Sequence, residues 1–233
     1  TGKFTLSGAN TYTGPTNVND GVLELLSTGA TNVAATLITV APTAALRITG
    51  NGSNAVMSGS LAGTGPVFIY PNQFGAAGQR DVTLNGTNTA YAGTLTIGST
   101  DSTVTATGTA RLTLSNPAQL GSANVIVQDR GQLFFTAATT FPNNIRITGT
   151  GYKDADANGG GLAAAALRTP SPFANDVSGN QFWMTGGIGA LRIDGGATLS
   201  GTITLAGNAK VASYGNTGTL SGSIKVTNDS DIF

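Results

Sequence analysis

The sequence contains neither cysteine nor histidine, and these two absences exclude several kinds of site. Without thiolate or imidazole ligands, the usual zinc and other transition-metal centres cannot be built. Ser-His-Asp and Cys-His nucleophilic systems are excluded for the same reason. Because no disulfide can form, the stability of the fold has to come from side-chain packing and backbone hydrogen bonds.

Charge is also scarce. Only 9% of the 233 residues are charged, against about 25% in a typical soluble domain, and 11 acidic residues balance 11 basic ones. The sequence has no basic cluster of the kind that binds nucleic acid. No apolar run approaches the roughly 20 residues of a transmembrane helix, and no signal peptide is visible. We therefore expect no nucleic-acid partner, no membrane-spanning segment in this chain, and either a mature protein or an excised piece of a longer one.

Apolar residues alternate with threonine and other polar residues along most of the chain. The runs are about 4–6 residues long and end at Gly, Asn or Asp-Gly, which is typical of short β-strands and turns. Helical spacing is nearly absent, and its one candidate, Gly161–Arg168, can equally be read as a strand. The pattern predicts an all-β protein, with strands around pairs such as Leu46/Ile48, Leu112/Leu114 and Ile203/Leu205.

Several phrases recur along the chain. Leu199–Leu205 (LSGTITL) returns 21 residues later at Leu220–Val226 (LSGSIKV), and LRITG at Leu46–Gly50 returns as IRITG at Ile145–Gly149 and LRIDG at Leu191–Gly195. A unit of roughly 20 residues is too small to fold alone but can form one rung of a solenoid. This repetition predicts a parallel β-helix, as one domain over all 233 residues. An antiparallel β-sandwich or an up-and-down barrel is the alternative, because such folds also contain many short strands.

The longest recurring phrase is LSGANTYTG at Leu6–Gly14, which returns with one added residue as LNGTNTAYAG at Leu84–Gly93. If a rung recurs, the leucine that opens each copy should fill the inside of the stack. We expect Gly86 to form a bend and Asn88 to occupy a turn. The added residue leaves open which way the second tyrosine points.

The first 25 residues, and in particular GKFTLSGANTYTGPTNVNDGVLEL, resemble the autotransporter-associated β-strand repeat. Pro15 departs from the pattern, because Gly is usual there. The resemblance implies a bacterial, cell-surface or secreted, right-handed parallel β-helix. It does not imply one activity, because such passengers include adhesins, proteases, lipases and inert stalks. The positions on the pattern are Leu6, Gly8, Asn10, Tyr12, Gly14, Thr16, Val18, Asn19, Gly21 and Leu23.

One short stretch has the spacing of metal ligands. Asp154, Asp156 and Asn158 place oxygen side chains at alternate positions before a glycine, as in the first half of an EF-hand loop. Ala165 stands where that loop needs a glutamate, so a complete EF-hand is excluded. A looser Ca²⁺ site and a plain solvated turn both fit these residues. No other cofactor is expected.

Residues 152–185 interrupt the rung pattern and are interpreted as an inserted loop. The loop contains Tyr152 and the adjacent pair Phe182 and Trp183. On a strand, one ring of an adjacent pair faces outward, where it can stack on a sugar or bind a partner. The same reasoning applies to Phe134-Phe135. The loop either binds a ligand through these rings or only covers them.

Catalysis is not expected. Enzymes that cleave polysaccharides need clustered carboxylates, and the acidic residues here are scattered among turns. Asp194 is the exception, because it replaces the threonine of the RITG phrase and should face outward beside neighbouring rungs. The sequence therefore favours an extracellular structural rod or stalk that stacks head to tail into a filament or matrix. An adhesin or glycan-binding module that contacts a glycan or host surface is the alternative, and a polysaccharide-active enzyme is the third.

Overall fold

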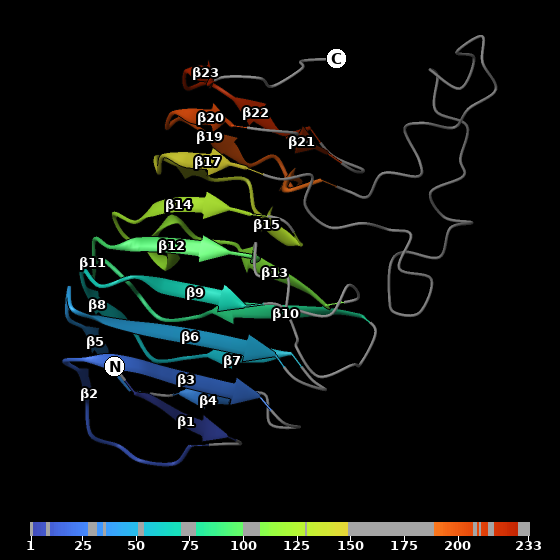
Figure 1. The fold of residues 1–233 in the computed structure, drawn as a ribbon. Helices are drawn as coiled ribbons and strands as arrows, with labels where there is room; N and C mark the ends of the chain where they lie inside the picture. Colours follow the sequence, from blue (N-terminus) through green and yellow to red (C-terminus); the bar gives the residue numbers. More distant parts are fainter. Residues whose placement is uncertain are drawn as a thin grey trace, which may run out of the picture.

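The chain forms a parallel β-helix, in which successive rungs stack from β1 at one end to β23 at the other (Figure 1). The computed structural model describes residues 2–7, 10–27, 32–34, 36–50, 54–70, 78–99, 108–128, 130–148, 189–206, 209, 211–213 and 217–227. Every strand pairing among these residues is parallel. The predicted all-β parallel β-helix is confirmed, and the antiparallel alternative is excluded for the described strands. None of the helices in this part of the chain has the length and apolarity needed to cross a bilayer.

One side of the β-helix is a nine-stranded sheet that runs the full height of the stack. Each of its strands pairs with the strand of the rung below and of the rung above, so its backbone hydrogen bonds run along the stack. Its strands, in spatial order, are β1 (Lys3–Ser7), β3 (Gly21–Ser27), β6 (Ala44–Gly50), β9 (Val67–Tyr70), β12 (Thr94–Ile97), β14 (Asn124–Val127), β17 (Ile145–Ile147), β20 (Ile203–Leu205) and β23 (Ile224–Val226).

The second side is a seven-stranded sheet. From β3 to β20, each strand of the nine-stranded sheet is followed in the chain by a strand of this second sheet, and the longest connection is the one between β17 and β18. In spatial order they are β4 (Asn32–Ala34), β7 (Ala55–Met57), β10 (Gly78–Leu84), β13 (Gly108–Leu114), β15 (Gly131–Phe135), β18 (Leu191–Ile193) and β21 (Val211–Ala212).

The third side consists of a four-stranded and a three-stranded sheet. Between them the chain forms the short 3-10 helix η1 (Pro117–Gln119), so one rung has a helical turn where its neighbours have a strand. Asn116 caps η1, and Gln119 completes a capping box. The strands are β2 (Thr16–Val18), β5 (Ile38–Val40), β8 (Leu61–Gly63) and β11 (Ala90–Tyr91), then β16 (Thr140–Phe141), β19 (Thr198–Leu199) and β22 (Thr219–Leu220).

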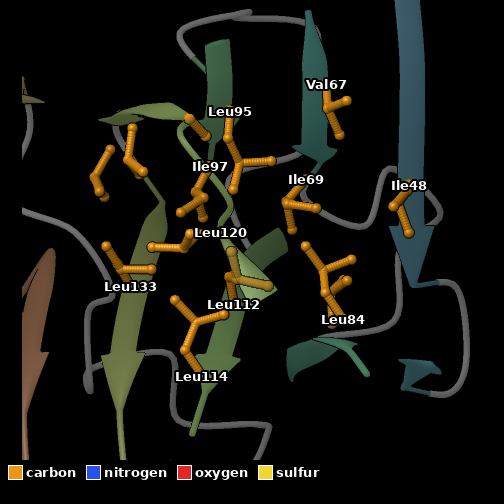
Figure 2. Close-up of a cluster of buried hydrophobic side chains, with 14 of the residues drawn as sticks. Ile48, Val67, Ile69, Leu84, Leu95, Ile97, Leu112, Leu114, Leu120 and Leu133 are labelled. Atoms are coloured by element: carbon orange, nitrogen blue, oxygen red, sulfur yellow. The ribbon is translucent and has the colours of Figure 1, made fainter. Parts of the chain in front are cut away.

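The period-two alternation predicts correctly which side chains face inward. Along the nine-stranded sheet, aliphatic residues at matching register positions form the inner column, part of which is seen in Figure 2. Neighbouring inward residues are 0–1% exposed in the middle rungs, for example Ile48, Ile69 and Ile97. Burial of this apolar surface is the main source of stability in the stack. The inner column comprises Phe4, Leu23, Leu46, Val67, Leu95, Val125, Ile145, Ile203 and Ile224, and in parallel Leu6, Leu25, Ile48, Ile69, Ile97, Val127, Ile147, Leu205 and Val226.

The two copies of the longest phrase do not stack on each other. Leu6 lies on β1 of the nine-stranded sheet, whereas Leu84 lies on β10 of the seven-stranded sheet. Leu84 is fully buried as predicted, and Leu6 packs against the core while partly exposed. Gly86 lies in a bend, where an added Cβ would overlap the Gly59 carbonyl oxygen of the rung below. The tyrosine of the second copy, Tyr91, points inward and is 1% exposed.

Asn88 lies in the turn predicted for it, and its side chain is buried. Its Oδ1 accepts a hydrogen bond from the Leu61 N–H at 2.7 Å, and its Nδ2 donates to the Gln119 carbonyl at 2.6 Å. The side chain therefore links the rung below to the rung above, where a strand pair is replaced by η1. Satisfying these buried backbone groups removes a cost of about 1–3 kcal/mol for each group left unpaired.

Candidate functional site

The six residues predicted as binding or metal sites lie outside the described residues, so the structure does not place them. They are Tyr152, Phe182 and Trp183 for ligand binding, and Asp154, Asp156 and Asn158 for Ca²⁺. The inserted loop predicted at 152–185 and the Gly161–Arg168 segment also lie there. Within the described ranges, no group of three or more Asp or Glu side chains is arranged to hold a metal ion.

The outer face of the seven-stranded sheet carries two arginine–carboxylate ion pairs. Arg111 on β13 pairs with Asp81 on β10 through two hydrogen bonds, Nε to Oδ1 and Nη2 to Oδ2, both at 2.7 Å. Asp81 and Arg111 are direct register partners on neighbouring strands. This two-point geometry is the strongest form of the arginine–carboxylate contact, and it leaves neither charge uncompensated.

Two rungs further along the same face, a second arginine pairs with a carboxylate. The Arg192 Nη2 atom lies 2.6 Å from the Asp194 Oδ2 atom, and Arg192 Nε donates to the same oxygen at 2.8 Å. Asp194 is 8% exposed. Asp194 lies on the outer face of the sheet, where it was expected, and its side chain is held there against the arginine of its own phrase. The substitution of Thr by Asp in LRIDG supplies that arginine with a counter-ion.

Phe134 lies between the two ion pairs. Its ring packs under the guanidinium carbons of Arg192, at 4.4 Å from the ring centroid, and of Arg111, at 5.2 Å. Phe135, the next residue, is fully buried and contacts Phe141 with ring centroids 4.4 Å apart. The prediction of one inward and one outward ring is confirmed. The outward ring serves as a platform for two cations, a contact worth about 0.5–2 kcal/mol each.

These carboxylates do not form a catalytic pair. Asp81 and Asp194 are separated by three steps across the sheet, which alone is about 14 Å at the usual strand spacing. Glycoside hydrolysis needs its two carboxyl groups within about 5–9.5 Å of each other. Each carboxylate is also held by an arginine in an ion pair. What the arrangement does provide is a bond between rungs on the outside of the stack.

A similar network joins the first rungs on the outer face of the nine-stranded sheet. The Glu24 carboxylate on β3 accepts hydrogen bonds from Lys3 Nζ at 2.7 Å and Thr5 Oγ1 at 3.1 Å, both on β1. From β6, Arg47 Nε lies 3.0 Å from Glu24 Oε1, and the Thr49 hydroxyl donates to that oxygen at 3.3 Å. One carboxylate therefore connects three consecutive strands.

The environment of Glu24 acts on its pKa in two directions. Burial raises the pKa, but the hydrogen bond from Lys3 and the positive charges of Arg47 and Lys3 together outweigh burial, so the net pKa is lowered. Arg47 in turn stacks on the Tyr70 ring at 3.6 Å from the centroid. The network thus extends from β1 to β9, over four adjacent strands.

The end of the stack that carries β1 is hollowed. A depression of about 410 Å³ is formed there by β1, β2 and β3. Asn17, Asn19 and Asp20 lie on its polar side. Its apolar lining consists of Phe4, Leu6, Val18, Val22 and Leu23.

The Glu24 network and the Phe134 platform were not predicted from the sequence. A signal for the first exists, because Thr5, Glu24 and Arg47 occupy the same register position in successive rungs. Recognising this signal requires knowing which residues pair between rungs. The rungs vary in length, from 19 residues between Phe4 and Leu23 to 58 between Ile145 and Ile203. A fixed repeat of roughly 20 residues does not place these side chains beside each other.

Comparison with known proteins adds one match. Residues 1–25 match the family model described as the passenger-associated-transport-repeat. Neither the curated proteins nor the solved structures contain a match to the chain. The resemblance inferred from the opening residues is thereby confirmed for that stretch. The first 25 residues are a repeat of the autotransporter passenger type, which indicates a surface-exposed passenger region.

Proposed function

We propose that this chain is a non-catalytic, extracellular β-helical rod that serves as a stalk or as a building unit of a bacterial surface layer. The observation that carries the proposal is the unbroken nine-stranded sheet with its inner column. At the usual spacing of about 4.8 Å, nine strands span about 38 Å along the stack. Head-to-tail stacking of such units into a filament or matrix belongs to the same proposal.

The side chains on the outside support a mechanical role. The ion pairs of Glu24, Asp81 and Asp194 each join residues of the stack to one another and leave no clustered free carboxylates in the described rungs. A load along the stack is shared by many backbone hydrogen bonds, each with a net contribution of about 0.5–1.5 kcal/mol. The ion pairs of Glu24 and Asp81 join neighbouring rungs, whereas Arg192 and Asp194 belong to one rung and contact the next through the Phe134 ring.

Electron microscopy of the purified chain, together with a panel of polysaccharides, tests this proposal. We expect rods or filaments and no turnover of any polymer, including uronic-acid polymers. Turnover that is lost in Asp194→Asn would contradict the non-catalytic assignment. Asp81→Asn is the matched control, because it removes the same kind of arginine partner on the same face.

An adhesin is the second candidate. It is favoured by one observation: β17 and β20 pair in unbroken register although residues 149–188 lie between them in the chain. The pairing of β17 with β20 does not require residues 149–188 to form part of the stack, so this segment is available to bind a glycan or a host surface. A glycan array with the wild type and Trp183→Ala distinguishes the two candidates, because a stalk binds no glycan in either form.

A further inference from the structure

We propose that the outer face of the nine-stranded sheet binds a linear acidic polysaccharide, which lies along the stack and carries a carboxylate on every second sugar unit. The inference rests on the second candidate function, a glycan-binding module, and deepens it by naming the class of glycan and by placing its contact on the described rungs instead of residues 149–188.

The surface in question is one row of side chains, with one residue from each strand of the sheet, and we call it the outer row. Each member lies between two residues of the inner column, so its side chain faces outward. A ligand that runs parallel to the stack can therefore touch one member in every rung. In spatial order the members are Thr5, Glu24, Arg47, Phe68, Thr96, Ile126, Arg146, Thr204 and Lys225.

The outer row carries two cations that have no carboxylate partner among the described residues. Arg146 on β17 and Lys225 on β23 are both exposed. No Asp or Glu occurs in β9, β12, β14, β17, β20 or β23, so this part of the sheet is positive and attracts an anionic ligand. The cations that do hold a described carboxylate are Lys3, Arg47, Arg111 and Arg192.

The distance between the two cations fits a polymer whose charges are widely spaced. β17 and β23 are two steps apart in the sheet, or about 10 Å at the usual strand spacing. One sugar unit of an extended polysaccharide is close in length to one strand step, so such a chain places one unit on each rung. A carboxylate on every second unit then meets Arg146 and Lys225 in turn, and Thr204 faces the unit between them.

The same distance disfavours a nucleic acid as the ligand. A strand of DNA carries a phosphate about every 3.4 Å, so about three phosphates would share each of these cations. Nucleic-acid affinity depends on the neutralisation of many phosphates, which two cations do not provide. The sparse charge of the outer row therefore favours a polysaccharide.

The middle of the outer row provides contacts for the uncharged parts of a sugar. Phe68 on β9 and Ile126 on β14 are half-buried, and Thr96 between them is only 6% exposed. Apolar and aromatic side chains of this kind pack against the C–H face of a sugar ring. On the same face, the exposed amides of Asn124 and Asn144 lie beside Ile126 and the Arg146 strand, where they can bond hydroxyl groups.

The outer face of the seven-stranded sheet does not offer the same combination in its described part. Its arginines, Arg111 and Arg192, hold Asp81 and Asp194, and both guanidinium groups pack on the Phe134 ring. The charges and the ring on that face are therefore already in contact with each other. This contrast assigns the ligand to the nine-stranded sheet.

Surface plasmon resonance on immobilised hyaluronan tests the proposal, because hyaluronan carries a carboxylate on every second sugar unit. The whole chain should bind at about 0.1 M salt and dissociate as the salt is raised towards about 1 M, since the charges are exposed and become screened. Hyaluronan whose carboxylates have been reduced to alcohols should bind several-fold more weakly. Absence of binding to hyaluronan at about 0.1 M salt would overturn the proposal.

Arg146→Ala/Lys225→Ala removes both cations and should weaken binding about three- to thirtyfold, the range for two exposed ion pairs. It should also flatten the salt dependence. Thr140→Glu/Thr219→Glu is the matched control, because it lowers the net charge equally at two exposed positions that are also two strands apart, on the three-stranded sheet. Equal binding by the alanine variant and the wild type, or an equal loss in the control, would contradict the assignment to the outer row.

Phe68→Ala should weaken binding and leave the salt dependence as it is in the wild type, because the ring contributes no charge. A thermal melt by circular dichroism verifies that this half-buried position tolerates the change. A salt dependence altered as strongly as in the alanine variant of the two cations would contradict the role assigned to the ring.

Thr204→Lys tests the placement of one sugar unit on each rung. The new cation lies between Arg146 and Lys225, so it should raise affinity for polygalacturonate, with a carboxylate on every unit, more than for hyaluronan. An equal gain for both polymers would contradict this placement.

Two further results would assign the surface or the ligand differently and overturn the proposal. Tighter binding to single-stranded poly(dT) than to hyaluronan would make the ligand a nucleic acid. Loss of hyaluronan binding in Trp183→Ala would place the glycan on residues 149–188. The rod itself fails on other evidence, namely compact particles in electron micrographs or turnover of a polymer, so the two failures are distinguishable.

Discussion

Ile145 on β17 pairs directly with Ile203 on β20, although residues 149–188 and strand β18 lie between them in the chain. The register is unchanged on both sides of this step, since Val125 pairs with Ile145 and Ile203 pairs with Ile224. The strands before and after residues 149–188 therefore stack as they would in a rung of ordinary length.

This continuity predicts that residues 149–188 can be replaced by a Gly/Ser link of about four residues, a length common for such connections. We expect a single cooperative thermal transition with an equal or higher midpoint. Shortening the connection about tenfold lowers the entropic cost of closing it by about 2 kcal/mol. The measurement is circular dichroism with temperature. The same link in place of residues 51–54, between β6 and β7, is the control. Separate melting of the rungs beyond β17 would contradict the prediction.

The inner column predicts that two isoleucines of the nine-stranded sheet differ strongly in how much their substitution lowers the free energy of unfolding. Ile69 faces inward and is fully buried, whereas Ile126 faces outward and is half-buried. Ile69→Ala should lower the free energy of unfolding by about 2–5 kcal/mol, because it leaves a cavity between rungs. Ile126→Ala should cost about 1 kcal/mol or less. Urea denaturation of both variants measures the difference, and equal costs would show that the column is not the main source of stability.

Alternation and repetition were sufficient to predict the fold, because a β-helix needs only inward aliphatic residues, turns and stacking. The pair Leu199–Leu205 and Leu220–Val226 shows this best: Leu199 stacks on Leu220 and Ile203 on Ile224, as the repeat implies. Other repeated phrases do not predict which residues stack on each other. Leu46 of LRITG lies in the nine-stranded sheet and Leu191 of LRIDG in the seven-stranded sheet, because the same alternation suits every side of the stack.

The outer contacts could not be predicted in the same way. Whether Glu24 meets Arg47, or Asp81 meets Arg111, depends on the number of residues in each corner, and those corners vary. Asp194 illustrates the consequence, since period two alone placed it outward but not against Arg192. The predicted ligand residues Trp183 and Asp154 fall where the structure describes nothing, and they stay predictions.

Two glycines of the recurring phrases should respond differently to the same substitution. An added Cβ at Gly86 would overlap the Gly59 carbonyl oxygen, whereas nothing lies within 4 Å of one at Gly14. Gly86→Ala should therefore cost about 1–3 kcal/mol, because the stacked backbones have to separate. Gly14→Ala should change stability by at most about 0.5 kcal/mol. Both are measured by urea denaturation. An equally mild Gly86→Ala would mean that the close contact between these two rungs is not needed.

The Glu24 network predicts a stability that depends on pH. Glu24→Gln removes the partner of Lys3 and Arg47, and hydrogen bonds to a charged group contribute about 1.5–3 kcal/mol, so we expect a loss of about 2 kcal/mol at pH 7. Because folding lowers the pKa of Glu24 below its usual value of 4.5, its contribution is complete above that value and disappears as the pH falls through the lowered pKa. The difference between wild type and variant should therefore shrink as the pH falls below the usual value of 4.5 and through the lowered pKa.

Urea denaturation at several pH values measures this difference directly. Asp20→Asn is the matched control, because Asp20 is exposed on the turn before β3 and its side chain accepts a hydrogen bond only from the adjacent Gly21 N–H among the bonds described for it. Its cost at pH 7 should stay within about 0.5 kcal/mol. If Glu24→Gln were as mild, or if its cost did not change with acid, the carboxylate would not be what holds β1 to the next two rungs.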